Sequence, residues 1–342
     1  MTKTMIAALA LLFSFSVVPA GAAQGNIDPK PYDQYAGCYE LSRGEFISVA
    51  RWEIEKGFEP LLFTDFKSGR IGVLSRSSDD AFTCGPGLLV NAPVAVKIQF
   101  IRNTRGEVVA LTYQQGGSQP RSAKRIKLNR EDVSFKNGAV TLSGTLSVPS
   151  TKGPHPAVVL IHGSGELGRH SFGPFAYFFA SRGFAVLTYD KRGTHNSTGD
   201  LAQATFDELA ADALAGVRFL SGRSDINRKQ IGLWGPSQGG FLSIVAASHS
   251  KDVAFAINYS GMIVPAWKQD LYRVEAEARA DGLSSDEIAE AVAFTKLQLE
   301  VGRTGEGWER FEAMMQQSKD KDWFRYVYVP ESLERARLAW RT

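Results

Sequence analysis

Alternating apolar and polar residues run through the segment from Tyr32 to Tyr113. Many of the apolar positions hold β-branched or aromatic residues, and glycine or polar turn residues separate the runs, a pattern typical of half-buried strands. We expect these strands to form a small antiparallel β domain or open barrel. The junction that follows is the Gly- and Ser-containing stretch QQGGSQPRSAKR.

After Arg130 the pattern changes to alternating strands and helices. VSFKNG and AVTLSGTLSVP predict a hairpin, and the continuous apolar run Ala157–Ile161 is typical of a strand covered on both faces. Two helical patterns, FGPFAYFFAS and TFDELAADALAGVRFLSG, then alternate with the apolar strands FAVLTYD and IGLWG, and a further helix and strand follow. This rhythm predicts a mostly parallel, doubly wound α/β sheet.

Beyond Met262 only helical patterns remain. Ser284 and Glu287 form an S-x-x-E capping box before an amphipathic run. Helices inserted after a strand of such a sheet commonly form a lid over the substrate site. The predicted organisation is a signal peptide at 1–22, a small β-rich domain at 23–125, an α/β core at 126–262 and a helical cap at 263–342.

The first residues have the character of a secretory signal peptide. Lys3 precedes an apolar run from Ile6 to Val18, and Ala20 and Ala22 form an A-x-A cleavage site. The alternative is an N-terminal membrane anchor, but the run is shorter than the roughly 20 residues that a bilayer requires. We therefore expect cleavage after residue 22 and an exported protein, periplasmic or secreted, with no stable membrane span.

Charge and cysteine content narrow the choice of partners. The formal net charge is only +3, and no basic run or zinc-ligand spacing occurs, so we expect no nucleic-acid partner. The two cysteines, Cys38 and Cys84, are an even count in an exported chain, which favours a disulfide between them. The alternative is two separately buried thiols.

The sequence Gly235-Pro236-Ser237-Gln238-Gly239 matches G-x-S-x-G. In a nucleophile elbow, glycines flank the serine because a sharp strand-to-helix turn brings neighbouring backbone too close for a Cβ atom. Here the apolar strand IGLWG leads into the motif and an apolar helix leaves it. This context makes Ser237 the candidate nucleophile.

A second glycine-rich turn, His162-Gly163-Ser164-Gly165, follows the strand AVVLI. In acyl-transfer enzymes a backbone N–H from such a loop and the N–H after the nucleophile hold the oxyanion. Gly163, Ser164, Gly165 and Gln238 are therefore the predicted oxyanion-hole residues, and we expect His162 to be structural rather than a base. In the loop from Tyr189 to Gly199, we expect Asp190 and Arg192 to form local hydrogen bonds.

These motifs together resemble the bacterial α/β-hydrolase superfamily, in its exported esterase, dienelactone-hydrolase-like and serine-aminopeptidase-like branches. LIHGSG, then YDKRG with STGD, then IGLWGPSQGG occur in family order over residues 130 to 262. The resemblance implies hydrolysis of a small-molecule ester or a peptide, without metal or organic cofactor. One departure is His195, where the related loop usually has glycine.

The expected triad order is Ser, then Asp or Glu, then His. His249 is the only histidine after Ser237, and at about 1.5 Å per helical residue it lies some 18 Å away. We expect either a truncated product of a longer gene or a protein without triad chemistry, and favour the first. The leading function is hydrolysis of carboxylic esters or related thioester or amide groups, and the alternatives are a serine aminopeptidase or a non-catalytic binding protein. No sequence signal indicates an oligomeric state.

Overall fold

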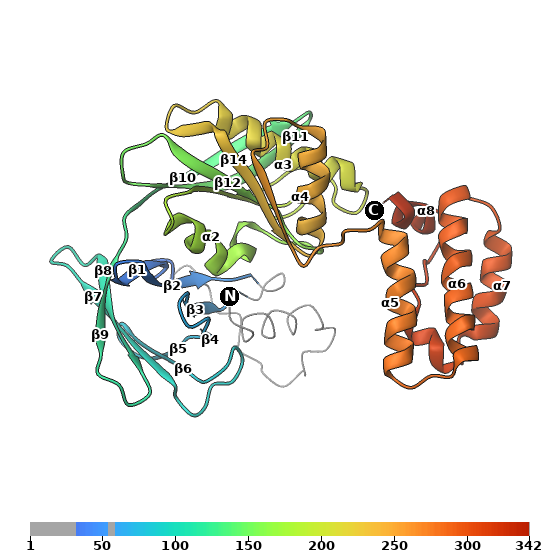
Figure 1. The fold of residues 1–342 in the computed structure, drawn as a ribbon, viewed down its shortest axis with the longest axis horizontal. Helices are drawn as coiled ribbons and strands as arrows, with labels where there is room; N and C mark the ends of the chain where they lie inside the picture. Colours follow the sequence, from blue (N-terminus) through green and yellow to red (C-terminus); the bar gives the residue numbers. More distant parts are fainter. Residues whose placement is uncertain (1–31, 54–58, 342) are drawn as a thin grey trace.

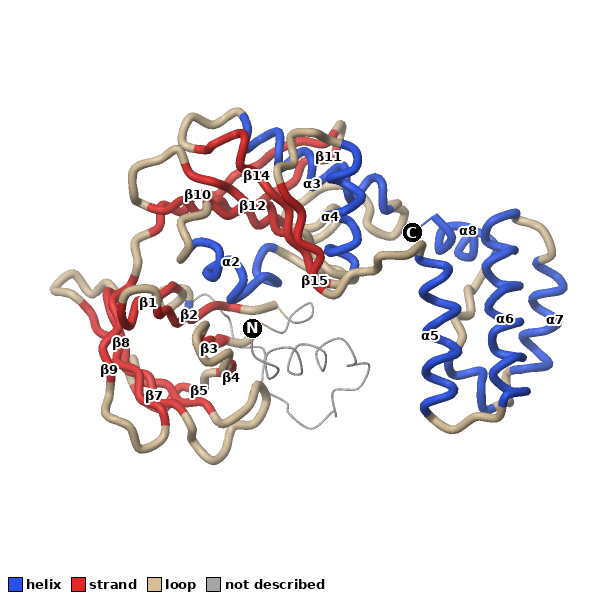
Figure 2. The backbone as a smooth tube through the Cα atoms, viewed as in Figure 1, coloured by secondary structure: helices blue, strands red, loops and turns tan. Residues whose placement is uncertain are grey.

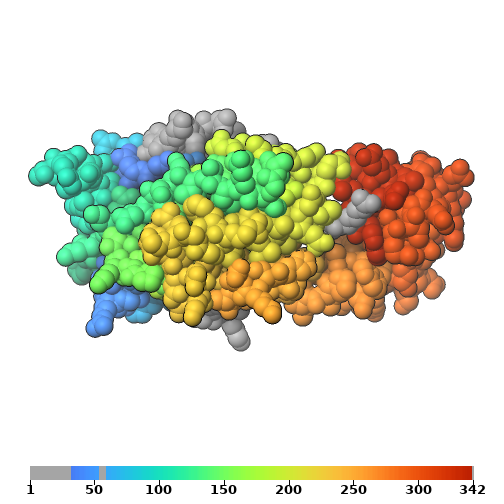
Figure 3. Space-filling model, turned by 90° about the horizontal axis from the view of Figure 1, so that it is seen from above, coloured from blue at the N-terminus to red at the C-terminus, as the bar shows by residue number. Residues whose placement is uncertain are grey.

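The computed structural model describes residues 32–53 and 59–341, which form three regions in chain order (Figures 1 and 2). An antiparallel β-rich region comes first, an α/β region follows, and a helical region lies at the other end of an elongated molecule (Figure 3). The predicted signal peptide lies outside the described residues. Within the described part of the chain, no helix is long and apolar enough to cross a membrane.

The β-rich region is one nine-stranded sheet in the order β4-β3-β2-β1-β9-β8-β7-β6-β5. Its inner face buries alternate apolar side chains such as Ile47, Phe63 and Leu111. The sheet curls on itself and brings its two ends together. A Cβ added to Gly72 in β4 would lie only 2.8 Å from the sulfur of Cys84 in β6. The strands are β1 (Gly37–Ser42), β2 (Glu45–Arg51), β3 (Leu61–Asp65), β4 (Ile71–Val73), β5 (Ser75–Ser78), β6 (Ala81–Cys84), β7 (Val96–Arg102), β8 (Val108–Gln115) and β9 (Arg121–Arg125).

The predicted disulfide between Cys38 and Cys84 is wrong, since both cysteines are free, buried thiols. Cys38 lies in β1 and Cys84 in β6, and β9, β8 and β7 separate these strands in the sheet. The two side chains also enter different clusters: Cys84 packs in the interior of the curled sheet, whereas Cys38 packs with Ala50 and Tyr177. Burial raises the pKa of Cys38 to about 12 and that of Cys84 to about 11.

The α/β region is a six-stranded sheet in the order β10-β11-β13-β12-β14-β15. The predicted hairpin forms, with Asn137 opposite Val140, and the strands from β12 onward pair in parallel. The strands are β10 (Leu128–Asn137), β11 (Val140–Pro149), β12 (His155–Leu160), β13 (Ala185–Tyr189), β14 (Ile226–Pro236) and β15 (Phe255–Tyr259). Because β12 lies between β13 and β14, the loops that leave β12 and β14 meet at one edge of the sheet.

Helices cover both faces of this sheet, as the continuous apolar strands require. Along β12, Val158 packs in the cluster that contains α2 (Gly173–Ala180), and Val159 packs in the cluster that contains α3 (Phe206–Ser221) and α4 (Gln238–His249). On its other side α2 contacts β2 and β3 of the β-rich region. The α2 helix is therefore the layer between the two sheets.

The helical region has its own apolar core, which includes Phe294, Phe311 and Trp323. The predicted capping box is present, since Ser284 and Glu287 each accept from the backbone N–H of the other. The helices are α5 (Ala266–Ala280), α6 (Ser285–Thr304), α7 (Trp308–Ser318), the 3-10 helix η4 (Asp322–Tyr326) and α8 (Leu333–Arg341).

Candidate functional site

Ser237 lies at a sharp turn between β14, which ends at Pro236, and α4, which begins at Gln238. Its backbone has φ 53° and ψ −123°, a conformation that residues with a Cβ atom rarely adopt. Its N–H donates to the carbonyl of Tyr259 at 2.9 Å, and its carbonyl accepts from the N–H of Gly240 at 2.9 Å. Strain of this kind persists only where the surrounding structure enforces it, and it concentrates at functional sites.

Two glycines of the motif allow the turn to pack closely. A Cβ at Gly239 would overlap the carbonyl oxygen of Ile161, just after β12, and a Cβ at Gly235 would overlap the backbone of Gly239. The sequence requires glycine here because backbone occupies the space of a side chain. The close packing sets Ser237 directly beside the loop that follows β12.

That loop carries the predicted oxyanion residues. A Cβ at Gly163 would lie 4.0 Å from the Cβ of Ser237 and 3.7 Å from the carbonyl oxygen of Pro236, so Gly163 adjoins the turn. Ser164 and Gly165 are exposed, and Gly165 has φ 96°. The structure thus brings Ser237, Gln238 and the start of the Gly163–Gly165 loop together.

Lys191 connects these elements, a role that the sequence analysis did not assign. Its ammonium group donates to the carbonyl of Gly163 at 2.8 Å, to the side-chain oxygen of Gln238 at 2.8 Å and to the carbonyl of Gly165 at 3.3 Å. Burial lowers the pKa of Lys191 to about 8. Its sequence signal was its place in the YDKRG motif, just after a buried strand.

Ion pairs fix the loop after β13, but where local hydrogen bonds were predicted for Asp190 and Arg192, their charged partners lie 21 and 20 positions away. Asp190 is buried and pairs with Arg169 at 2.9 Å. Burial acts to raise the pKa of Asp190, but the hydrogen bonds from Arg169 outweigh it and the pKa is lowered. Arg192 pairs with the buried carboxylate of Asp212 at 2.7 Å. Both pairs anchor the residues that flank Lys191.

His162 is buried between aromatic rings, in agreement with a structural role. Its ring lies 4.7 Å from that of Phe172 and 4.9 Å from that of Tyr189, centroid to centroid. Within residues 32–53 and 59–341, neither ring nitrogen has a hydrogen-bond partner. Burial lowers the pKa of His162 to about 3, so the ring is neutral at physiological pH.

In the described part of the chain, no hydrogen bond joins the side chain of Ser237 to a histidine. His155 contacts the carbonyl of Thr151, His195 pairs with Glu53, and His249 is the last residue of α4. Among the described residues, Ser237 therefore has no histidine hydrogen-bonded to it as a base.

A cleft of about 390 Å³ opens beside this turn and extends to α8. Gly165, Lys191 and Gln238 form one wall of it. The rest of the lining is mostly apolar, with one anion and one cation, and includes Glu166, Leu201, Phe206, Leu209, Tyr328, Arg335 and Leu338. The helical region therefore contributes to the space in front of the predicted oxyanion loop.

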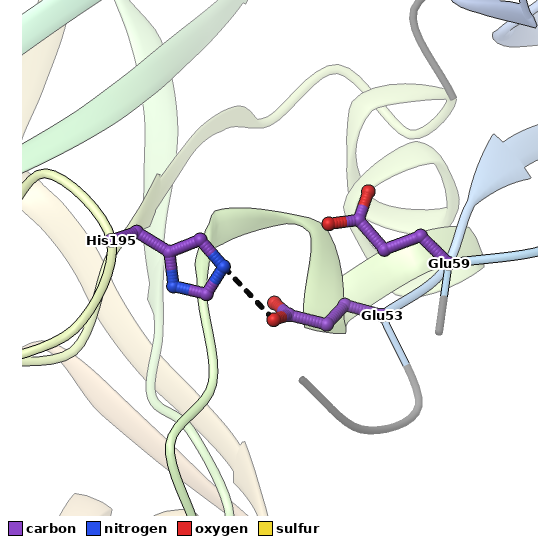
Figure 4. Close-up of side chains that lie close together, drawn as sticks. All are labelled: Glu53, Glu59 and His195. Carbon is purple, nitrogen blue, oxygen red and sulfur yellow. Dashed lines mark ion pairs between the residues drawn. The ribbon is translucent and has the colours of Figure 1, made fainter. Parts of the chain in front are cut away.

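Three potential metal ligands, Glu53, Glu59 and His195, meet where the β-rich and α/β regions join (Figure 4). Their ligand atoms lie within 4.8 Å of one another. His195 Nε2 is 3.0 Å from Glu53 Oε1, and Glu59 pairs with the guanidinium of Arg51. Because Glu53 pairs with His195 and Glu59 pairs with Arg51, we interpret the cluster as an ion-pair junction. Sequence reasoning missed it, although His195 in place of the usual glycine was a signal.

A mostly parallel sheet between two helical layers, with a serine at the strained turn after β14, defines a member of the α/β-hydrolase superfamily. Residues 109–330 match the family model described as X-Pro dipeptidyl-peptidase (S15 family). This match covers more than half of the chain, and the chain belongs to that family.

Several characterised proteins are similar to parts of this chain. Esterase EstD of Thermotoga maritima is 34% identical over 128 residues, which are 34% of this chain and 31% of the esterase. Polyketide transferase grgF of Penicillium sp. is 30% identical over 166 residues, which are 47% of this chain and 56% of the transferase. The quorum-quenching protein AidA of Acinetobacter baumannii is 28% identical over 37% of this chain and 42% of its own length. The chain thus spans between about a third and just over half of these relatives.

Solved structures give a similar partial match. The crystal structure of the α/β hydrolase GrgF from Penicillium sp. sh18 has 29% sequence identity and a TM-score of 0.37. The matched region covers 45% of this chain and 54% of the GrgF chain.

Proposed function

We propose that the protein is a serine hydrolase in which Ser237 attacks the carbonyl carbon of a carboxylic ester. The observation that carries the proposal is the strained backbone of Ser237, at a strand-to-helix turn that adjoins Gly163. Such a turn presents the hydroxyl at the carboxyl edge of the sheet, where a substrate can approach it.

The reaction would follow the acyl-enzyme course. The Ser237 oxygen bonds to the carbonyl carbon and loses its proton to a base, and the carbonyl oxygen becomes an oxyanion held by the N–H of Gln238 and one from the Gly163–Gly165 loop. Collapse of this intermediate expels the alcohol, which takes a proton, and leaves an acyl group on Ser237. Water then releases the acid and regenerates the serine. The triad acid and base are not assigned to any described residue.

The cleft beside Gln238 supports a small ester or a related thioester. Its volume of about 390 Å³ is at the lower end of small-molecule sites, and Leu201, Phe206 and Leu338 would contact an apolar acyl chain. Similarity to an esterase agrees with this choice. The family match favours a second candidate, cleavage of a peptide bond after an X-Pro dipeptide.

Because no described histidine forms a hydrogen bond with the Ser237 side chain, we expect the 342-residue chain to hydrolyse p-nitrophenyl acetate only weakly, since loss of the base in serine enzymes costs on the order of 10⁶ in turnover. Added imidazole can replace a missing histidine base. We therefore expect imidazole to raise the rate in the unsubstituted chain above the rate in Ser237→Ala. Equal imidazole-dependent rates in the two proteins would refute the proposal and favour a non-catalytic binding protein.

The same assay distinguishes the two substrate classes. Imidazole-supported, Ser237-dependent release of nitrophenol from acetate and butyrate esters supports the esterase. Faster release of nitroaniline from Ala-Pro-p-nitroanilide would instead support the X-Pro peptidase. Robust ester turnover without imidazole, abolished by Ser237→Ala, would show that a base reaches the serine from an unassigned position.

A further inference from the structure

The β-rich region contacts the loop after β12 through the residues that follow β2. The indole N–H of Trp52 donates to the carbonyl of Ser171 at 2.8 Å, and the backbone N–H of Glu53 donates to the carbonyl of His170 at 3.1 Å. Gly173 packs on the ring of Trp52 so closely that a Cβ would lie 2.8 Å from it. These contacts dock one end of the loop on the other sheet.

Glu53 also inserts a carboxylate into this interface. It is 1% exposed, and its Oε2 accepts from the backbone N–H of Gly168 at 2.6 Å. A buried carboxylate is costly unless donors surround it, so its presence constrains the position of those donors. Gly168 is only five residues beyond Gly163, so the carboxylate acts on the same short loop that adjoins Ser237.

His195 supplies a second contact to Glu53 from the α/β region, an ion pair rather than a hydrogen bond (Figure 4). Its Nε2 lies 3.0 Å from Glu53 Oε1, and its backbone has φ 47°, the left-handed conformation that glycine adopts most easily. The imidazole therefore occupies a position that favours glycine. Its ring also leaves no room for a side chain at Gly168, since a Cβ there would lie 2.9 Å from the ring.

The other side of the loop is held by the segment after β13. The N–H of Lys191 and the hydroxyl of Thr194 both donate to the carbonyl of Leu167, at 3.2 and 3.1 Å. The Lys191 ammonium also binds Gly163. The residues from Gly163 to Gly168 are thus held between the segment after β13 on one side and Glu53 on the other.

We infer that Glu53 is a positioning residue for the oxyanion loop, and that the β-rich region, through the Glu53–His195 pair, holds the Gly163–Gly168 segment in its working geometry. The expected effect of Glu53 on catalysis rests on the proposed function. The effect of Glu53 on the position of the loop does not, because the hydrogen bond to Gly168 is a property of the fold.

Hydrogen exchange in the full chain tests the positioning. We expect Glu53→Ala and His195→Asn to speed exchange in peptides covering residues 163–170 by roughly tenfold, because each removes a partner that holds the loop. Asparagine tolerates a positive φ, so His195→Asn removes the imidazole without opposing the backbone. Glu53→Gln should retain most of the protection, since its side-chain oxygen can accept from Gly168.

Glu45→Gln is the matched control, because Glu45 is an acidic residue of β2 that pairs with Lys67 and Arg121 within the same sheet. It should leave exchange at 163–170 unchanged. If Glu53→Ala and His195→Asn leave that exchange within about twofold of the original, or if exchange in α3 rises equally, the positioning is wrong.

Imidazole-supported, Ser237-dependent hydrolysis tests the catalytic consequence. We expect kcat to fall by about tenfold in Glu53→Ala with little change in KM, because oxyanion donors act in the transition state. An unchanged kcat with a loosened loop would overturn the inference. If the unsubstituted chain shows no Ser237-dependent hydrolysis, the proposed function fails, and exchange at 163–170 alone decides whether Glu53 positions the loop.

Discussion

The ammonium group of Lys191 donates a hydrogen bond to the carbonyl oxygen of Gly163 at 2.8 Å, from a side chain that is almost fully buried. The same group binds the side chain of Gln238, so one cation joins the loop after β12 to the helix that begins after Ser237. Both proposed sources of oxyanion donors are therefore attached to one titratable residue. This arrangement makes the site sensitive to the protonation of Lys191.

We predict a loss of Ser237-dependent hydrolysis as pH rises through about 8, the pKa of Lys191. A neutral amine has one donor fewer for Gly163, Gly165 and Gln238. Free imidazole is already neutral near pH 8, so the added imidazole does not itself lower the rate in this pH range. The pKa in the folded state lies below the ordinary 10.5, so between pH 8 and 10.5 the unfolded chain binds more protons, and this group's contribution to the free energy of unfolding increases.

The rate should therefore fall in a pH range where Lys191 does not destabilise the fold. The measurement is a pH–rate profile beside thermal unfolding at each pH. Lys191→Met should have a lower rate at pH 7 and no limb near pH 8. A limb that persists in Lys191→Met would assign it to another group.

Much of the framework was predictable because its signals are local. The β10–β11 hairpin, the apolar strands of the parallel sheet and the turn at Ser237 all follow from neighbouring residues. The glycines around Ser237 are informative because backbone fills the space of a side chain. Such local constraints can be recognised from a few consecutive residues of the sequence.

The errors and omissions concern contacts between distant segments. The pairing of Cys38 with Cys84 depended on strand order, and the sequence does not show that β9, β8 and β7 lie between them. Glu53 and Gly168 are in contact although they are 115 positions apart in the sequence, and no periodic pattern of residues indicates that contact. Lys191 stood in a recognised motif, but its role depends on three acceptors from other loops.

Backbone strain at Ser237 predicts a trade between stability and reactivity. Ser237→Gly removes the Cβ that disfavours φ 53°, so we expect it to be more stable than Ser237→Ala by about 1 kcal/mol, although both lack the nucleophile. Urea unfolding of the two variants measures the difference. Gly117→Ala is a control for general glycine effects, because a Cβ there contacts nothing within 4 Å. Equal stability of the two Ser237 variants would show that the turn is unstrained.

The two thiols should resist modification in the native state. Cys38 and Cys84 are buried, and burial raises the pKa of each thiol to about 12 and about 11, so little thiolate is present at pH 8. We expect iodoacetamide to label neither residue in the folded protein and both in urea without reductant. Intact mass spectrometry gives the number of labels. Failure to label after unfolding without reductant would instead indicate a disulfide.

Export remains a proposal that a direct measurement can decide. The A-x-A site at Ala20 and Ala22 predicts a mature chain that begins at Ala23. N-terminal sequencing of protein recovered from the periplasm or medium of an expressing bacterium should give this terminus. Replacing both alanines with lysine should block cleavage, because signal peptidase sites require small residues. Recovery of exported protein with an intact Met1 terminus would contradict the prediction.

His162 predicts a specific sensitivity to acid. Burial holds the pKa of His162 at about 3 in the folded protein, against an ordinary value of 6.5. As pH falls below 6.5 the unfolded chain takes up a proton that the folded chain does not, so the free energy of unfolding decreases by up to about 1.4 kcal/mol per pH unit. Between pH 6.5 and 4.5 this one residue should lower the free energy of unfolding by about 2 to 3 kcal/mol.

His162→Gln cannot titrate and should lose less stability over that interval, even though its stability at pH 7 is lower because a buried amide needs partners. Urea unfolding at pH 7, 5.5 and 4.5 compares the pH dependence of the two proteins, and parallel slopes for the unsubstituted chain and His162→Gln would show that His162 is protonated within the fold.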